Sequence, residues 1–350
     1  MKISQYNSQK IKVLSFIAIM MVLYIHAIYK ESFDYPLANS IQVFLSFTGI
    51  SFIANPFFYC ISGFLFFTGV SNIQDCYPKL KKRVRTLIIP YIIWNIIFVM
   101  WYVILAIIPG ISQFVNNNMV REIFGDDILS IPHKLFVVPA GFQLWFVRDL
   151  IIYVFFSPII YLLLKKFGVI IPFLFFIVGS IGLIYLPSEI KLWGLFFFIL
   201  GGWIALYSSF DIIQREISVP IASILGCIYL LNAFLRSFQL FPYSGCDILI
   251  ELCGLIAMWR LYDVIVKTGT GKLTILLATL GNYAFFIYLF HEPTFNIIKK
   301  LGIKILPMSE HCLIGLYLIN PLIMAALSII VAKYLKKILP KTYGVLVGGR

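Results

Sequence analysis

Residues 86–109 read TLIIPYIIWNIIFVMWYVILAIIP and contain no charged side chain. A helix needs about 20 consecutive apolar residues to cross the hydrocarbon core of a bilayer. Inside a bilayer every backbone polar group has to be paired within the protein, which leaves helices and closed β-barrels as the spanning structures. Barrel strands alternate apolar and polar residues, and this stretch does not alternate. It therefore predicts a transmembrane helix.

The composition of the whole chain agrees with this stretch. Of the 350 residues, 61% are hydrophobic and 12% are charged, and the mean hydropathy is +0.95. A soluble globular domain is about 25% charged. These values exclude a soluble enzyme, a disordered protein and a collagen-like fibre, and they predict an integral membrane protein that crosses the bilayer many times.

Apolar windows along the chain predict an all-α, polytopic bundle of about ten transmembrane helices, which forms a single domain over residues 1–350. The windows are 11–29, 41–70, 86–109, 142–164, 168–186, 190–208, 216–235, 245–262, 274–295 and 312–335. The longest connection, over residues 110–141, is expected to be a solvent-facing loop.

The second window is too long for one crossing and contains Asn55 followed by Pro56. Proline removes a helical hydrogen bond and disfavours helical geometry at the preceding residue. We therefore expect a helix over 41–54, a kink, and a second helix over 57–69. An ordinary proline kink without function is the simpler alternative.

The distribution of the formal net charge of +13 predicts the orientation of the chain. With the N-terminus in the cytoplasm, 19 of the 28 Lys and Arg residues lie on the cytoplasmic side and 9 on the outer side, as the positive-inside rule requires. Both termini are then cytoplasmic. We expect a multi-pass protein of a bacterial cytoplasmic membrane, whose partner is the lipid bilayer and not a nucleic acid. The six cysteines form no CxxC or CxH pair, so no metal site is expected.

Few ionisable residues fall inside the predicted spans, where they are costly and indicate function. Residue counting places His26 in the first window, His291 and Glu292 in the ninth, and Arg148 and Asp149 in the fourth at a similar depth. A histidine can act as a general base, a carboxylate can orient it, and an arginine can hold an anion or a developing oxyanion. Each residue alone also has a structural interpretation, as an interfacial histidine, a snorkelling arginine or a helix end.

Short motifs occur in order along nearly the whole chain. They are IKVLS and VLYIH within 11–26, FFYCISGFL at 57–65, KKRVR at 81–85 with the pair PY at 90–91, LWFVRDL at 144–150 and FFIYLFHEP at 285–293. Their order and spacing resemble those of acyltransferase family 3, a family of integral membrane acyltransferases.

The resemblance implies transfer of an acyl group, usually acetyl, from acyl-CoA to a hydroxyl of a carbohydrate or related cell-envelope acceptor. It implies that His26 is the general base or a transient acyl carrier. His291 would be a second proton-handling or substrate-orienting group, with Glu292 fixing its tautomer, and Arg148 would stabilise negative charge or anchor the acceptor. Acetyl-CoA is the expected donor, and no metal ion takes part.

Two groups of residues are expected to bind the acyl-CoA donor. Ser62 and Gly63 lie at the broken second span, where glycine allows a ligand to approach closely, although helix packing by small residues explains them equally well. Lys82, Arg83 and Arg85 would face the phosphates of coenzyme A in the cytoplasm. The positive-inside rule explains the same charges without a ligand.

The chain departs from the family pattern at Ser15, where many members carry an arginine eleven positions before the catalytic histidine. Lys12 lies one helical turn earlier on nearly the same face and could supply this charge.

Two other functions stay open on the sequence alone. A broken helix and membrane-embedded His, Arg and Glu also suit a proton-coupled small-solute transporter, although no inverted repeat is visible. The other is a non-catalytic component of a polysaccharide assembly complex. The sequence indicates neither the acceptor, nor the acyl chain length, nor a protein partner.

Overall fold

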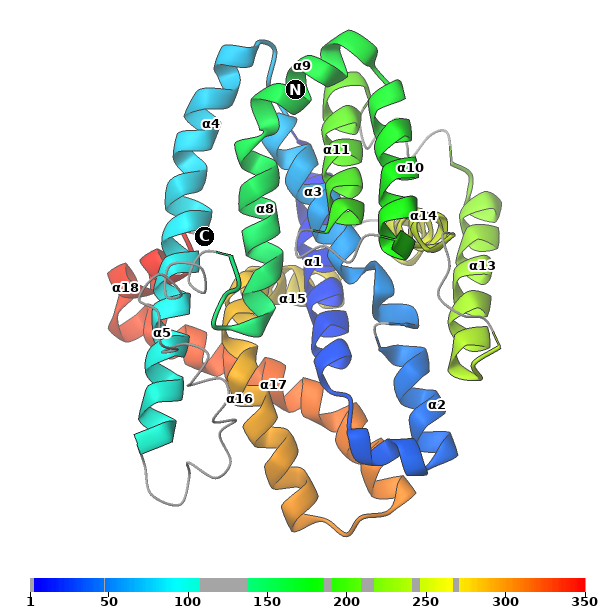
Figure 1. The fold of residues 1–350 in the computed structure, drawn as a ribbon, viewed down its shortest axis with the longest axis vertical. Coiled ribbons are helices and arrows are strands. Elements are labelled where there is room, and N and C mark those ends of the chain that lie inside the picture. The colour runs from blue at the N-terminus through cyan, green and yellow to red at the C-terminus, as the bar shows by residue number, and fades with distance from the viewer. Residues whose placement is uncertain are drawn as a thin grey trace.

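The computed structural model describes residues 3–46, 48–107, 137–185, 191–208, 217–240, 246–266 and 271–349. These residues form helices and no β-strand (Figure 1), which confirms the predicted all-α class. The α-helices are α1 (Gln5–His26), α2 (Pro36–Leu45), α3 (Ala54–Phe67), α4 (Cys76–Arg83), α5 (Ile89–Ile107), α8 (Trp145–Phe155), α9 (Ser157–Phe167), α10 (Ile170–Tyr185), α11 (Leu192–Tyr207), α13 (Val219–Ser237), α14 (Asp247–Ile265), α15 (Lys272–Gly281), α16 (Ala284–Ile305), α17 (Glu310–Ile338) and α18 (Pro340–Leu346). Short 3-10 helices are η1 (Lys30–Asp34), η2 (Ile50–Ile53), η3 (Ile73–Asp75) and η6 (Phe142–Leu144), and η4 (Val84–Ile88) is π-helical. Most of the predicted loop over 110–141 lies outside the described residues.

Several of these helices suit a bilayer. Among the described residues, five helical segments are long and apolar enough to cross a membrane, namely Gln5–His26, Pro36–Phe67, Ile73–Ile104, Val219–Ser237 and Glu310–Ile338. The number rises to seven if two bent pairs each count as one span, α8 with α9 at 58° and α15 with α16 at 62°. The structure therefore supports a helical membrane bundle. The count of ten spans and the cytoplasmic position of both termini remain predictions.

The second apolar window is broken, as predicted, but the break lies before Pro56. α2 ends at Leu45 and α3 begins at Ala54, after the turn η2. Pro56 lies in the first turn of α3, where a helix does not need the N–H that proline lacks. The break contains a turn at Thr48 and Gly49, and a Cβ atom on Gly49 would lie 1.8 Å from the carbonyl oxygen of Phe44. Only glycine fits so close an approach.

α3 and α11 pack backbone against backbone near the centre of the bundle (Figure 1). A Cβ atom on Gly63 would lie 2.0 Å from the carbonyl oxygen of Phe198, and one on Gly201 would lie 1.9 Å from that of Cys60. Small residues at such crossings allow helices in membranes to approach closely. The contacts support the packing interpretation of Gly63.

Replacing Gly63 with alanine is expected to destabilise the protein, because the added methyl group forces α3 and α11 apart. Overpacking of this kind costs about 1–3 kcal/mol. The measurement is the unfolding temperature in detergent, with Gly315→Ala as control, because a Cβ atom at Gly315 in α17 meets nothing within 4 Å. An unchanged unfolding temperature together with a raised KM for the acyl donor would instead support the donor-binding interpretation.

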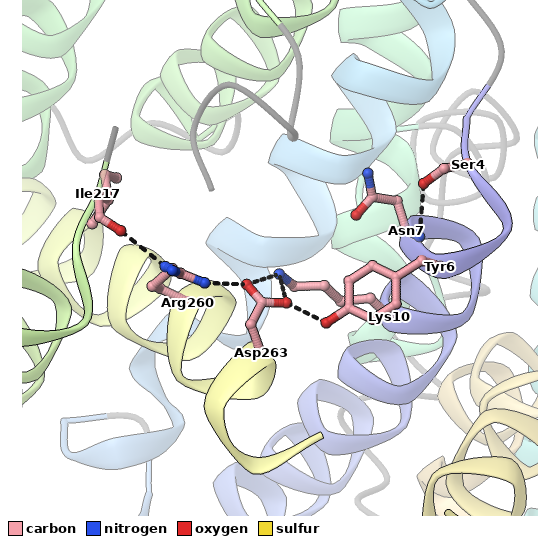
Figure 2. A network of polar contacts seen from close by, with 7 residues as sticks. All are labelled: Ser4, Tyr6, Asn7, Lys10, Ile217, Arg260 and Asp263. Atoms are coloured by element: carbon pink, nitrogen blue, oxygen red, sulfur yellow. Dashed lines mark hydrogen bonds and ion pairs between the residues drawn. The ribbon is translucent and has the colours of Figure 1, made fainter. Parts of the chain in front are cut away.

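A buried polar network ties the first turns of α1 to the end of α14 (Figure 2). Lys10 has no exposed surface, and its Nζ donates to both carboxylate oxygens of Asp263 at 2.8 Å. The hydroxyl of Tyr6 donates to the same carboxylate at 2.6 Å, and Nη1 of Arg260 does so at 3.2 Å. A buried charge is stable only when it is paired in this way. The network fixes one end of α1, and the opposite end carries a candidate catalytic residue.

Candidate active site

His26 is the last residue of α1, and two neighbouring helices hold the end of this helix. Lys299 of α16 donates from Nζ to the backbone carbonyls of His26 at 2.8 Å and Ile28 at 3.2 Å. The last carbonyls of a helix have no partner within the helix. The hydroxyl of Tyr317 in α17 donates to the carbonyl of Tyr24 at 3.3 Å. These contacts fix the backbone from which the His26 side chain projects.

α16 is interrupted directly after His291. Glu292 has extended backbone angles, φ −103° and ψ 142°. Pro293 has no N–H and therefore leaves the carbonyl of Leu289 without its helical partner. The interruption changes the direction in which consecutive side chains project, so that two neighbours in the sequence reach the same residue of α1.

The structure brings His26, His291 and Glu292 together. The ring centroids of the two histidines are 4.9 Å apart, with 58° between the ring planes. Nδ1 of His26 lies 3.9 Å from Oε1 of Glu292, and these side chains are 18% and 11% exposed. Phe142 packs edge-on against the ring of His26 at 6.1 Å between centroids. The separation of 3.9 Å exceeds a hydrogen bond, but contacts between catalytic groups often shorten when substrate binds.

Hydrogen bonds within α16 determine which nitrogen of His291 carries the proton. Nδ1 lies 2.7 Å from the carbonyl oxygen of Tyr288 and 3.2 Å from that of Ile287. A carbonyl oxygen only accepts, so Nδ1 is protonated and Nε2 presents a lone pair. Nε2 is buried and has no hydrogen-bond partner within the described part of the chain. Backbone carbonyls therefore set this tautomer in place of Glu292, whose carboxylate faces His26.

The carboxylate of Glu292 is held on its other side by Asn296. Nδ2 of Asn296 donates to Oε2 at 2.6 Å, which leaves Oε1 directed at His26. A carboxylate in this position orients an imidazole and stabilises its protonated form. The arrangement can therefore take a proton from a hydroxyl group. Among the described residues, no three His, Cys, Asp or Glu side chains are arranged to hold a metal ion.

Arg148 belongs to a different polar cluster. Its Nε and Nη2 donate to Oδ1 of Asp149 at 2.9 and 2.8 Å, and its Nη1 donates to the carbonyl of Val137. The other carboxylate oxygen of Asp149 accepts from the backbone N–H of Lys191 at 3.1 Å. These contacts tie α8 to the residue before α11, and none of them joins Arg148 to His26. Its role in anchoring the acceptor remains a prediction.

Removing one member of the Arg148–Asp149 pair is expected to destabilise the protein by about 3–5 kcal/mol, because the other charge is then buried without its partner. The variants are Arg148→Ala, Asp149→Ala and the double variant, which should lose less stability than the sum of the single variants. Unfolding temperatures test this, with Arg85→Ala at an exposed position as control. An unchanged unfolding temperature and a raised acceptor KM for Arg148→Ala would show that Arg148 binds the acceptor.

The residues that form this site lie within a long match to one protein family. The profile of the acyltransferase domain family, Acyl_transf_3, matches residues 9–335. The chain belongs to the acyltransferase 3 family. It is therefore an acyltransferase that transfers groups other than amino-acyl groups.

One curated relative of this acyltransferase is the succinoglycan biosynthesis protein ExoH of Rhizobium meliloti (strain 1021). The two sequences are 23% identical over 364 aligned positions, which cover 98% of this chain and 92% of the relative. No solved structure matches the chain.

None of the contacts described above joins the expected donor residues of the acyltransferase to the histidine pair. Gly63 packs against α11, and Ser62 is half-buried one position before it. Lys82 and Arg85 are exposed and Arg83 is half-buried at the junction of α4 and η4. α4 contacts the end of α3 farthest from His26, since Nζ of Lys79 donates to the carbonyls of Phe66 and Thr68. Ala54 at the start of α3 belongs instead to the same buried cluster as Val22 and Ala27 near the end of α1. The basic residues and the histidine pair therefore lie about one length of α3 apart, roughly 20 Å.

The structure also shows the surroundings of Ser15, where the chain departs from the family pattern, and of Lys12. Ser15 is half-buried, and Lys12 is exposed. The carbonyl of Lys12 packs against Gly281, where a Cβ atom would lie 2.1 Å from it. Lys10 is the buried cation of this part of α1, and it is paired with Asp263. No contact among the residues described here assigns Lys12 the role of the missing arginine, which stays a prediction.

Sequence reasoning missed three residues of the site, Gln143, Asn296 and Lys299. Lys299 lies beyond the ninth predicted window, which ends at residue 295, but α16 extends to Ile305 and includes it. Pro293 indicates that a donor such as Gln143 is needed, because a proline inside a helix leaves a carbonyl that a donor from elsewhere in the chain must satisfy. Nothing in the sequence identifies that donor.

Proposed function

We propose that this acyltransferase moves an acyl group from acyl-CoA to a hydroxyl of a cell-envelope polysaccharide, with His26 as the general base. The observation that carries the proposal is the position of Nδ1 of His26, 3.9 Å from the carboxylate of Glu292 and beside the ring of His291. A largely buried carboxylate–imidazole pair next to a second imidazole is suited to activating a hydroxyl group.

In the proposed reaction, Glu292 orients His26 so that its Nδ1 carries a proton and its Nε2 has a lone pair. Nε2 of His26 takes the proton of the acceptor hydroxyl while the hydroxyl oxygen attacks the thioester carbonyl. The new C–O bond forms, the C–S bond breaks, and the proton on His26 passes to the departing thiolate of coenzyme A. Glu292 stabilises the imidazolium that exists between these two proton transfers.

His291 is proposed to accept a hydrogen bond from the acceptor. Its Nε2 has a lone pair, is buried and has no partner among the described residues. A buried polar atom without a partner is costly, and an acceptor hydroxyl would satisfy it. His291 thus orients the acceptor, while His26 removes the proton.

The proposed donor and the proposed class of acceptor are supported by different observations. The exposed Lys82 and Arg85 carry charge that suits the phosphates of coenzyme A. Lys82 belongs to α4, which lies at the same upper end of the view in Figure 1 as the N-terminus, away from α16. A polysaccharide acceptor follows from the name of ExoH, a succinoglycan biosynthesis protein. Acetyl is the acyl group that we propose first. Succinyl is the alternative, and the mass measurement described next distinguishes the two groups.

The test compares the mass of envelope polysaccharide from cells with the gene, without it, and with the His26→Ala variant. The expected result is one missing acyl group per modified sugar in the second and third samples, and the mass difference identifies the acyl group. Purified protein should then transfer that group from its CoA thioester to the deacylated polysaccharide. Unchanged polysaccharide, or transport of a small solute without consumption of acyl-CoA, would overturn the proposal.

A further inference from the structure

We propose that Gln143 is a positioning residue of the transfer reaction, which holds the interruption of α16 in the geometry that presents Glu292 to His26. This inference rests on the proposed function of His26 and Glu292.

Gln143 lies in η6, directly before α8, and reaches across to α16. It is 2% exposed. Its Nε2 donates to the carbonyl oxygen of Leu289 at 3.3 Å and to that of Glu292 at 3.0 Å. The two carbonyls lie on either side of His291 in the sequence, so a single amide group spans the interruption.

The two carbonyls need a donor because of the sequence of α16. In a regular helix the N–H of residue 293 would bond the carbonyl of Leu289, but Pro293 has no N–H. The extended backbone of Glu292 also takes its carbonyl out of the regular helical pattern. Unpaired carbonyls inside a bilayer are costly and must be satisfied by neighbouring side chains. Gln143 supplies both hydrogen bonds and thereby selects this arrangement of the backbone.

The contact between η6 and α16 is reciprocal. The hydroxyl of Tyr288 donates to the backbone carbonyl of Gln143, so each segment donates to the other. Phe142, the preceding residue, packs edge-on against the ring of His26. η6 therefore touches both halves of the proposed catalytic pair, His26 directly and Glu292 through Gln143.

Stability alone is a poor explanation of a glutamine here. Oε1 of Gln143 is buried and finds no hydrogen-bond partner among the residues that the structure describes, and a buried atom of this kind lowers stability. Gln143 therefore keeps a polar amide group here at some cost in stability. The two hydrogen bonds that its Nε2 donates fix the backbone on either side of His291, including that of Glu292. Such local inconsistencies are typical of functional sites.

The test replaces Gln143 with methionine, which has a similar length but donates no hydrogen bond, and with glutamate, which keeps the shape. We expect kcat to fall about 10- to 100-fold in both variants, since a displacement of about 1 Å in a catalytic group costs about 10²-fold. KM for donor and acceptor should change little, because Gln143 does not contact substrate in the proposed arrangement. Gln74→Met, at an exposed glutamine in η3, is the matched control and should keep wild-type kcat.

A double-mutant cycle separates positioning from a general loss of structure. If Gln143 acts through Glu292, Gln143→Met should have almost no further effect on kcat in a Glu292→Gln background. The unfolding temperatures of all variants are measured alongside, and if Gln143→Met does not fold, the cycle uses Gln143→Glu. Equal reductions of kcat in both backgrounds, or wild-type kcat in the Gln143 variants, overturn the inference.

Failure of this inference is distinguishable from failure of the proposed function. If wild-type transfer depends on His26 but not on Gln143, the inference about Gln143 fails alone. If transfer persists in His26→Ala, the proposed base is wrong whatever the Gln143 variants do.

Discussion

Replacing His26 with alanine is expected to reduce acyl transfer by about 10²- to 10⁴-fold, the contribution of a well-placed general base. The reason is the position of His26 beside Glu292 and His291, where its imidazole is the group that can take the proton of the acceptor hydroxyl. The substitution leaves the contacts that hold the end of α1 in place, because Lys299 binds the backbone carbonyl of His26 and not its side chain. Expression and the unfolding temperature should therefore remain close to those of the wild type.

The assay for this variant is transfer from acyl-CoA per mole of folded protein. His311→Ala is the matched control, because His311 is an exposed histidine in the first turn of α17. Full transfer by His26→Ala would remove His26 from the mechanism. A covalent acyl group trapped on wild-type protein in the absence of acceptor, and absent from His26→Ala, would instead make His26 a nucleophile.

The approach of His26 to His291 and Glu292 could be predicted from the sequence because helical geometry is regular. Counting at 1.5 Å per residue places residues from two different spans at one depth, and the cost of polar groups in lipid suggests that they face each other. Counting cannot give the rotation of each helix about its axis. Arg148 was placed at the same depth, yet its guanidinium bonds Asp149 beside it in the sequence.

The positions of helix breaks were harder to predict than their existence. Pro56 correctly indicated a broken second window, but a proline in the first turn of a helix costs little. The break lies at the turn that includes Gly49, which packs against Phe44. The bend between α8 and α9 and the one between α15 and α16 were missed. Such breaks depend on packing partners distant in the sequence, as the contacts of Gln143 with α16 illustrate.

Replacing Glu292 with glutamine should lower kcat by about 10²- to 10⁴-fold, the range that a general base contributes, because a neutral amide neither stabilises the imidazolium of His26 nor fixes its tautomer. The amide has nearly the shape of the carboxylate, so the fold should be unaffected. Its effect should fall on kcat and not on KM, since Glu292 acts on the proton transfer through His26. Glu31→Gln, at an exposed glutamate in η1, removes the same charge outside the site and is the control.

The partner of Glu292 also makes a distinct prediction. Asn296 donates to Oε2 at 2.6 Å and directs the other oxygen toward His26, so Asn296→Ala should lower kcat less than Glu292→Gln does. In the His26→Ala background neither substitution should lower the residual rate further, because both act through the imidazole that has been removed. Additive losses in that background would place Glu292 in direct contact with substrate and would separate its role from that of His26.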